Sequence, residues 1–321
     1  MFRWNMRRGE LIAFESGTQK SIEIKSKRLL KKINLEFDPA VVVAGGSASG
    51  TVVEDALLLV MPKIEVVVNG LTPIFKMDAQ ALYWKNRFEH RIPAALTAPA
   101  DGSAVTNNLV CNLTIHFGNN IGRNYSDSFL PLDLFRTTEL FVTWGALNDM
   151  FTGTYDRAAT VAATYGLRPV FYETTGPRPA FVRIQNYIEK EISATQTDFP
   201  VDLSYNTNKI YQNLFFKTLD AGARDSDVIN YISIETDETT THINRIPYDQ
   251  LRNINEVDFQ IDALPAGFAY LPLSEEGMIK SGLNVFDVKK TKMTLDVTVG
   301  AGTTMLRVYE DMMVPVESVL G

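Results

Sequence analysis

Hydrophobic and polar residues alternate with a period of two along several stretches of this chain. Residues 32–37, 109–117, 258–263 and 293–299 each place apolar side chains on one face of an extended segment and polar ones on the other. Strands with one wet face are typical of antiparallel sheets that cover a core on one side, whereas parallel α/β sheets use strands that are apolar throughout. The pattern predicts an all-β chain built as sandwiches or barrels.

Helical periodicity is scarce by comparison. Residues 78–90 (DAQALYWKNRFEH) are the best candidate, with Asp78 as N-cap, and residues 247–254 (PYDQLRNI) form a shorter one in which Pro247 suits the first turn. Residues 155–166 (YDRAATVAATYG) are a third possibility. We therefore expect only short helices, located in the connections between strands.

Three blocks of sequence occur twice and in the same order. LFVTWG at 140–145 shares four of six residues with LDVTVG at 295–300, and LRPVFYE follows the first copy as LRVYE follows the second. Upstream, PKIEVVVNG leads to IFKMDAQAL much as NYISIETDE leads to INRIPYDQL. The two better helix candidates both follow this upstream block. The order predicts a duplicated unit, and 321 residues suffice for two units that each bury a core.

The two copies differ in the length of one connection. Gly145 and Leu167 are 22 positions apart, whereas Gly300 and Leu306 are 6 apart, so the first copy carries 16 additional residues. An insertion of this size usually lies in a surface loop. The stretch TTGPRPAF continues neither strand pattern, because its glycine and prolines interrupt extended pairing, and it places the boundary between the units at about residue 177.

Charge is concentrated at the amino terminus. Residues 1–32 have a balance of +6 although the whole chain carries −7. Arg3, Trp4, Arg7 and Arg8 combine cations with an aromatic ring, a mixture that suits a layer of anionic lipid headgroups. No DNA- or RNA-binding motif accompanies the charge, so we expect no sequence-specific nucleic-acid binding. A disordered basic tail without a special partner, or a tail that contacts the genome, is the alternative interpretation.

No catalytic or metal-binding motif emerges from the sequence. GGSASGT at 45–51 lacks the lysine of a P-loop and does not fit a nucleophile elbow. The three histidines, His90, His116 and His242, match no zinc spacing, and the acidic turns at 220–227 and 235–238 lack the pattern of an EF-hand. No apolar run is long enough for a membrane-spanning helix, and no secretory signal is recognisable. We expect no cofactor, no metal and no enzymatic activity.

The two antiparallel units, their short helices, the segment LPAGFAYLPL and the closing pair LDVTVGAGTTMLRVYED together resemble one protein family. They are similar to the double jelly-roll major capsid proteins of tailless, lipid-containing icosahedral bacteriophages, of the corticovirus and finnlakevirus kind. The resemblance implies two tandem eight-stranded antiparallel jelly-roll barrels. It also implies homotrimers with a pseudo-hexagonal outline that tile an icosahedral shell over an internal membrane, next to neighbouring capsomers and penton or vertex proteins.

This resemblance assigns roles to particular segments. Residues 1–20 would form a basic arm that faces lipid or genome, residues 21–176 the first barrel and residues 177–321 the second. The chain would be a virion component assembled in the host cytoplasm. The barrel cores would contain Cys111, Leu113, Ile115, Leu140, Val142, Trp144, Leu295, Val297 and Val299.

Two other classes of protein remain open from the sequence. One is a minor capsid or spike protein of the same fold, which would fill a vertex or bind a receptor. The other is a carbohydrate-binding or carbohydrate-active jelly-roll protein, in which Tyr83, Trp84 or Tyr125 would form an exposed platform for a sugar ring.

Overall fold

A computed structural model gives the fold of the chain. It describes residues 3–43, 52–90, 95–99, 105–118, 125–151, 159–161, 166–203, 208–237, 240–274, 279–286, 288 and 290–320. The described chain divides into two compact units, the first comprising residues 3–118 and 129–179 and the second residues 125–128 and 180–320. The N-terminal residues expected to form an arm belong to the first unit. The main division falls three residues after the expected boundary at 176.

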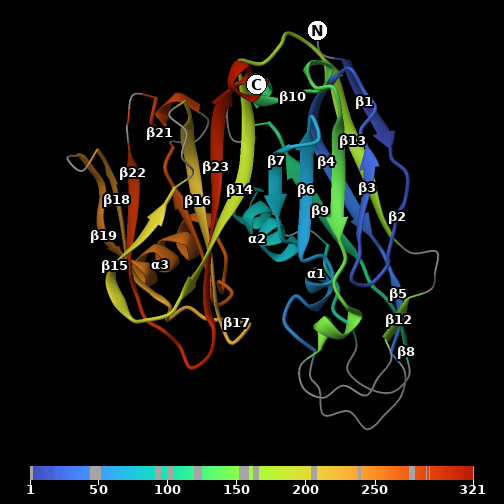
Figure 1. Ribbon diagram of the computed structural model, residues 1–321. Coiled ribbons are helices and arrows are strands. Elements are labelled where there is room, and N and C mark those ends of the chain that lie inside the picture. Colours follow the sequence, from blue (N-terminus) through green and yellow to red (C-terminus); the bar gives the residue numbers. More distant parts are fainter. Residues whose placement is uncertain are drawn as a thin grey trace. The chain divides into compact units, whose positions relative to one another are not determined.

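The first unit is a sandwich of two antiparallel sheets (Figure 1). In one sheet β13 lies between β4 and the short strands β1 and β2, with β9 and β10 on the far side of β4. The other sheet has the order β7, β6, β11, β3. The strands are β1 (Arg3–Arg8), β2 (Ile12–Ala13), β3 (Gln19–Glu23), β4 (Leu29–Phe37), β6 (Lys63–Val68), β7 (Thr72–Met77), β9 (Cys111–His116), β10 (Leu130–Pro131), β11 (Thr138–Thr143) and β13 (Gly166–Thr175).

Alternation within the strands builds the core of this unit. Ile33, Leu35 and Phe37 of β4 are 0–1% exposed and pair with Ile115, Leu113 and Cys111 of β9, which are equally buried. Leu140 and Val142 contribute to the core from the opposite sheet and are completely buried, and Trp144 follows just after the end of β11. The Trp144 ring lies 5.3 Å from the ring of Phe37, so the two sheets meet through aromatic contact at this end.

The second unit repeats this arrangement. One sheet places β23 between β14 and β16, with β17, β20 and β21 paired to β16, and the other has the order β15, β22, β18, β19. Its strands are β14 (Phe181–Ile192), β15 (Gln196–Asp202), β16 (Ile210–Asp220), β17 (Ala223–Arg224), β18 (Ile229–Thr236), β19 (Thr240–Pro247), β20 (Phe268–Pro272), β21 (Leu283–Asn284), β22 (Thr291–Val297) and β23 (Thr304–Pro315).

The two units have the same connectivity. The eight principal strands are, in chain order, β1, β3, β4, β6, β7, β9, β11 and β13 in the first unit and β14, β15, β16, β18, β19, β20, β22 and β23 in the second. In each unit the first, third, sixth and eighth of these strands form one sheet, and the second, fourth, fifth and seventh form the other. The repeated hexapeptides therefore lie in equivalent strands, because β11 and β22 are both the seventh. This confirms the duplication that the repeated blocks predict.

A turn between the fourth and fifth strands shows the equivalence at atomic detail. In the first unit the Asn69 N–H donates to the Thr137 carbonyl at 2.9 Å, and the Asn69 side-chain oxygen accepts from the Arg136 N–H at 2.8 Å. In the second unit Asp237 makes the same two bonds to Lys290, at 2.9 and 3.1 Å. Both turn residues have a positive φ, near 50°, which Asn and Asp tolerate better than most residues.

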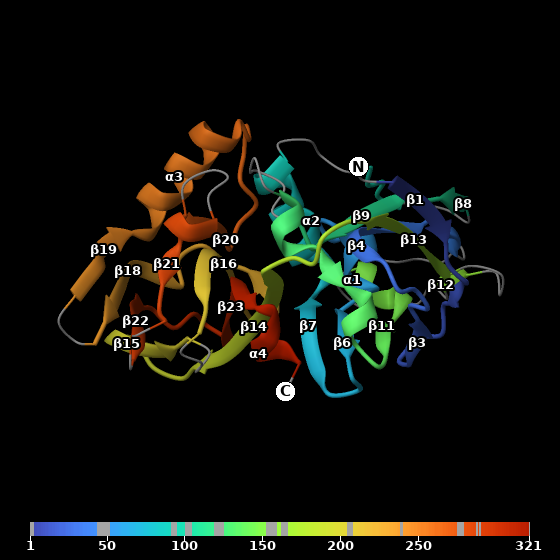
Figure 2. The same ribbon diagram turned by 90° about the horizontal axis from the view of Figure 1, so that it is seen from above.

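The principal helices follow the fifth strand of each unit, as expected. Helix α2 (Ala79–His90) is capped by Asp78, whose carboxylate accepts from the Ala81 N–H at 2.9 Å, and α3 (Tyr248–Phe259) begins directly after Pro247. In Figure 2, α2 lies against β9 and α3 beside β20. The shorter helices are α1 (Ala56–Leu59), α4 (Val316–Val319), η1 (Tyr125–Ser128), η2 (Leu132–Leu134), η3 (Leu147–Met150) and η4 (Ile279–Ser281). No described helix has the length and hydrophobicity needed to cross a membrane.

Two local predictions were wrong. The alternating pattern at 258–263 does not form a strand, because α3 extends to Phe259 and ends at Gln260, which adopts a left-handed conformation with a φ of 55°. The third helix candidate, residues 155–166, contains strand β12 (Ala159–Val161) instead, and its remaining residues before Gly166 lie outside the described chain.

Strand β12 belongs to a small sheet that distinguishes the first unit. It pairs with β5 (Ala40–Val43), which also pairs with β8 (Val105–Asn108). Part of the 16-residue insertion therefore builds this three-stranded sheet, which has no counterpart in the described part of the second unit. The glycine-rich segment 45–51 lies outside the described residues.

Val299 differs from the other expected core residues. Leu295 and Val297 are 0% and 1% exposed, whereas Val299 is only half-buried. Strand β22 ends at Val297, and the Val299 N–H donates to the Thr195 side-chain oxygen instead of continuing the ladder. The alternation of inward and outward side chains stops where strand pairing stops.

This difference gives a matched pair of variants. Val297→Asp places an unpaired carboxylate in the core, so we expect it to lower the free energy of unfolding by about 4 kcal/mol. Val299→Asp leaves its carboxylate within reach of water, and we expect a loss of about 1 kcal/mol or less. Urea denaturation midpoints of the two variants measure the difference. Equal losses would contradict the assignment of Val297 to the core.

Candidate functional surfaces

The N-terminal residues form an edge strand and not a detached arm. The backbone of β1 pairs with β13 from Arg3 opposite Thr175 to Arg8 opposite Val170. Antiparallel pairing along six residues fixes this segment against the body of the first unit. The structure does not describe the side chains of Arg3 and Trp4. The expected lipid- or genome-facing segment is therefore part of the sandwich.

Arg7 and Arg8 have different surroundings although they are adjacent. The Arg7 guanidinium pairs with the Glu173 carboxylate at 3.0 Å and lies 4.6 Å from the centre of the Phe171 ring. Glu173 is buried, so Arg7 neutralises a carboxylate within the unit. Arg8 is 64% exposed and lies 3.7 Å from Glu36, an arrangement that leaves it available to solvent. Of the two arginines, only Arg8 has the exposed side chain expected of a residue that binds a partner.

A second group of cations gathers at the end of the first unit where β4 begins. Lys25, Lys27 and Arg28 lie in the connection from β3 to β4, and Arg136 lies in the connection to β11; all four are exposed. We call these four residues the basic rim. A shallow groove of about 390 Å³ separates the two connections, with Lys25, Lys27 and Arg136 in its lining.

The basic rim is held in place by main-chain hydrogen bonds. The Ile24 N–H donates to the Thr138 carbonyl at 2.7 Å, and the Leu132 N–H donates to the Arg28 carbonyl at 3.1 Å. Trp4 of β1 is aligned through Thr174 with Leu29, so the start of β1 lies at the same end of the unit. The structure thus brings together basic segments that are separate in the sequence.

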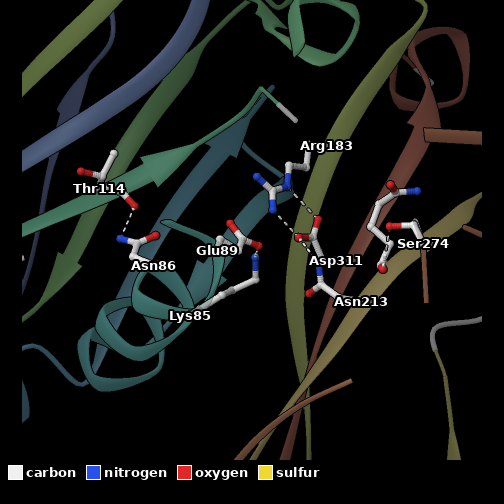
Figure 3. Close-up of polar contacts among 9 residues, drawn as sticks. Lys85, Asn86, Glu89, Thr114, Arg183, Asn213, Ser274 and Asp311 are labelled. Carbon is white, nitrogen blue, oxygen red and sulfur yellow. Dashed lines mark hydrogen bonds and ion pairs between the residues drawn. The ribbon is translucent and has the colours of Figure 1, made fainter. Parts of the chain in front are cut away.

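The second unit contains a buried polar cluster on three adjacent strands, β14, β23 and β16 (Figure 3). Arg183 of β14 forms two hydrogen bonds with Asp311 of β23, one of them from Nε at 2.8 Å. Asn213 of β16 donates to the same carboxylate at 3.0 Å. Arg183 is 5% exposed and Asp311 is fully buried. This bidentate geometry satisfies the carboxylate and ties the three strands together.

Lys209 and Tyr211 are a further pair of buried ionisable groups in this unit. The Tyr211 hydroxyl donates to the Glu310 carboxylate at 3.3 Å, and burial is the main cause that raises the pKa of Tyr211. Burial lowers the pKa of Lys209 to about 8, against the smaller opposing influence of Glu310.

Cys111 has the chemistry of a nucleophile and Asp220 that of a metal ligand, but the surroundings of both are those of structural residues. The Cys111 thiol is buried, and desolvation raises its pKa far above the normal value, so it has little thiolate character. Within the described chain, no three His, Cys, Asp or Glu side chains converge on a possible metal position. Asp220, in one of the acidic turns, instead accepts hydrogen bonds from the N–H groups of Ala301 and Gly302 at 3.0 and 3.1 Å.

Two of the three aromatic residues considered for sugar binding, Tyr83 and Trp84, do not form an exposed platform. Tyr83 and Trp84 of α2 are 7% and 5% exposed, and the Trp84 indole N–H donates to the Asp55 carboxylate at 2.7 Å. The side chain of Tyr125 lies outside the described chain. The sandwich architecture and the absence of such a platform at Tyr83 and Trp84 direct attention to assembly surfaces.

Comparison with solved structures defines the fold. The STIV major capsid protein superimposes with a TM-score of 0.74 at 11% identity, and the match covers 99% of both chains. The major capsid protein P2 of bacteriophage PM2 matches with a TM-score of 0.66 at 11% identity over 98% of both chains. This chain has the double jelly-roll fold. The PBCV-1 virus capsid protein is also similar, with a TM-score of 0.60 at 12% identity over 98% of this chain and 95% of that one.

Sequence comparison gives no corresponding relative. No protein-family model matches the chain, and no curated protein matches it. A double jelly roll tolerates this divergence because its cores require apolar residues of suitable size at alternate positions and few particular residues. The fold is thus recognisable in three dimensions at identities near 11%.

Sequence reasoning missed the residues that the double jelly roll brings together across long distances. The Arg183–Asp311 pair joins residues 128 positions apart, and Arg7 and Glu173 are 166 apart. No periodicity or motif marks these partners. A charged residue flanked by apolar side chains within a strand was the available signal, as at Arg183 between Val182 and Ile184.

The buried ion pair leads to a prediction about stability. Arg183→Met leaves the Asp311 carboxylate without its cation, and we expect a loss of about 3–5 kcal/mol in the free energy of unfolding. Combining Arg183→Met with Asp311→Asn removes the buried charge and keeps a partner for Asn213, so most of the loss should be recovered. Chemical denaturation of both variants measures this, and a double variant no more stable than Arg183→Met would refute the explanation.

The lowered pKa of Lys209 leads to a prediction that stability depends on pH. Its folded pKa of about 8 is below the unfolded value, so between about pH 8 and 10.5 the unfolded chain binds more protons. The stability of the wild-type chain relative to Lys209→Met should therefore rise by up to about 2 kcal/mol across this window and stay constant below it. Denaturation at a series of pH values measures the difference, and a constant difference up to pH 10.5 would contradict the lowered pKa.

Proposed function

We propose that this chain is the major capsid protein of a tailless icosahedral virus, a structural protein and not an enzyme. The observation that carries the proposal is the pair of complete, tandem jelly rolls, which matches viral capsid proteins over 98–99% of this chain. The described residues present buried polar groups that serve packing, and they assemble no catalytic constellation. The chain would be located in the virion after assembly in the host cytoplasm.

The duplication supports a homotrimer as the building block. Two similar units per chain and three chains per oligomer provide six nearly equivalent positions, so a three-fold oligomer can tile a hexagonal net. The additional sheet β12–β5–β8 distinguishes the first unit from the second. Neighbouring capsomers and the penton or vertex proteins would contact the outside of this trimer, and no sequence-specific contact with nucleic acid is expected.

Helix α3 offers a surface for a second copy in such a trimer. Ile254 and Val257 on this helix are 39% and 77% exposed. The equivalent helix α2 is buried continuously from residue 79 to residue 86. Because the two helices occupy the same place in their units, we infer that α3 becomes covered by another chain in the oligomer.

A minor capsid or spike protein of the same fold is the alternative function. It would share the barrels and differ in its copy number in the particle. Tyr83 and Trp84 do not form the platform expected of a carbohydrate-binding protein, because both rings are buried. An internal lipid membrane beneath the shell belongs to the proposal, and the exposed cations of the first unit are compatible with it.

The native mass tests the trimer. Three chains of 35.9 kDa give about 108 kDa, and we expect light scattering to find this species over a range of dilution. Electron microscopy of the concentrated protein should show hexagonal tiles. A monomer at all concentrations would overturn the tiling proposal.

Substitution on α3 tests the surface. Ile254→Lys combined with Val257→Lys adds charges to the apolar face, so the trimer should dissociate at concentrations at least about tenfold higher than for the wild type. The matched control is Asn253→Lys with Asp258→Asn, which makes the same change of +2 in net charge at exposed polar positions of the same helix. Equal dissociation of both variants would point to charge and not to the apolar face.

A further inference from the structure

A leucine at the end of the first unit is almost completely exposed. Leu71 follows the turn between β6 and β7, and 88% of its surface is accessible. It is the most exposed large hydrophobic residue in the described chain. A single exposed leucine is ordinary on a protein surface, so the meaning of Leu71 depends on its neighbours.

The turn that carries Leu71 is rigid. Asn69 and Gly70 both have positive φ values, 53° and 73°, and the Leu71 N–H donates to the Val68 carbonyl at 3.3 Å. Asn-Gly favours this turn because both residues tolerate positive φ, and residues 69–71 connect the paired Val68 and Thr72. The two hydrogen bonds of Asn69 attach the turn to Arg136 and Thr137. Leu71 is thus presented at the tip of a hairpin whose position is fixed.

The neighbours of this tip are the cations of the basic rim. Arg136 is bonded through its backbone to Asn69, and Lys25 and Lys27 line the groove on the other side of Arg136. Two of the nearby carboxylates already have cations, because Glu23 pairs with Lys25 at 3.4 Å and Asp133 with Arg178 at 3.2 Å. A third, Glu139, lies opposite Glu23 on β11. Lys27, Arg28 and Arg136 form no ion pair within the described chain. The rim therefore carries a positive charge that its own unit does not neutralise.

The equivalent tip of the second unit has the opposite chemistry. Its sequence is TDETT in place of VNGLT, with Asp-Glu where the first unit has Asn-Gly and a threonine where it has Leu71. Asp237 makes the same backbone bonds there as Asn69 does, and Lys290 stands at the position of Arg136. These bonds are therefore made without a leucine or an Asn-Gly pair in the turn. Leu71 is particular to the first unit and is available to a partner.

We propose that Leu71 and the basic rim dock this end of the first unit on an anionic lipid bilayer. A protruding apolar side chain surrounded by cations matches a membrane interface, where the leucine enters the acyl boundary and the cations meet headgroup phosphates. This inference rests on the proposed function, and it assigns the lipid contact to the hairpin tip and not to Arg7, which Glu173 occupies.

The contact combines two contributions that can be separated by experiment. Burial of the leucine is insensitive to salt, whereas attraction between the rim and anionic headgroups is screened over about 10 Å at 0.1 M salt. We therefore expect weak binding to neutral vesicles and stronger, salt-dependent binding to anionic ones. Free inorganic phosphate would compete only if the rim bound phosphate alone.

Vesicle co-sedimentation of the full chain tests the proposal. The probes are phosphatidylcholine vesicles with and without about one third phosphatidylglycerol. Leu71→Ser should lower the partition coefficient on anionic vesicles about tenfold, and Lys27→Gln with Arg136→Gln should lower it about twentyfold or more. The charge-matched control is Arg8→Gln with Arg168→Gln, and it should bind nearly as the wild type. Arg8 lies four residues, about 13 Å, along β1 from Trp4, and Arg168 lies six residues, about 20 Å, along β13 from Thr174.

The outcomes separate this inference from the proposed function. Light scattering on the same samples shows whether the oligomer is intact. An intact trimer that ignores anionic vesicles, or that binds them equally with Leu71→Ser and with the rim variant, would overturn the docking surface and leave the capsid proposal standing. Loss of binding in the control with Arg8→Gln and Arg168→Gln alone would place the lipid contact on β1 and β13 and overturn the docking surface. Inhibition by millimolar phosphate with no effect of Leu71→Ser would identify a phosphate site and overturn the bilayer contact.

Discussion

The packing of alternate side chains between two antiparallel sheets is the constraint on which the rest of this structure depends. Each unit closes because one face of every principal strand is apolar, as Leu35 and Phe37 are in β4 and Leu295 and Val297 in β22. A shift of one residue in pairing would turn these side chains to solvent. The register is therefore fixed strongly, and the connections can vary without changing the two sandwiches.

That freedom of the connections distinguishes the two units. The first unit uses three of them to build the sheet β12–β5–β8, and it carries Leu71 with the basic rim at other connections. The second unit keeps the same turn geometry at Asp237 with acidic chemistry. The different connections give one chain two similar sandwiches with two different sets of surfaces.

Buried polar groups provide specificity within the sandwiches. Arg7 with Glu173 and Arg183 with Asp311 each link neighbouring strands through charge-assisted hydrogen bonds. Such pairs stabilise weakly in comparison with apolar packing, yet removal of one partner is costly. They favour a single arrangement of strands over slipped alternatives. Residues that look functional by charge alone, such as Arg7, can have this structural role.

The sequence by itself determined the all-β class, the duplication, the placement of α2 and α3 and most of the core, because these follow from local periodicity. It misassigned Val299 and residues 258–263, where alternation continues beyond the strand or coincides with the end of a helix. Only the tertiary structure decided that β1 pairs with β13, that Arg7 neutralises Glu173, and that the turn before Leu71 is bonded to Arg136. Antiparallel pairing joins segments far apart in the chain, and no local pattern encodes which distant partners will meet.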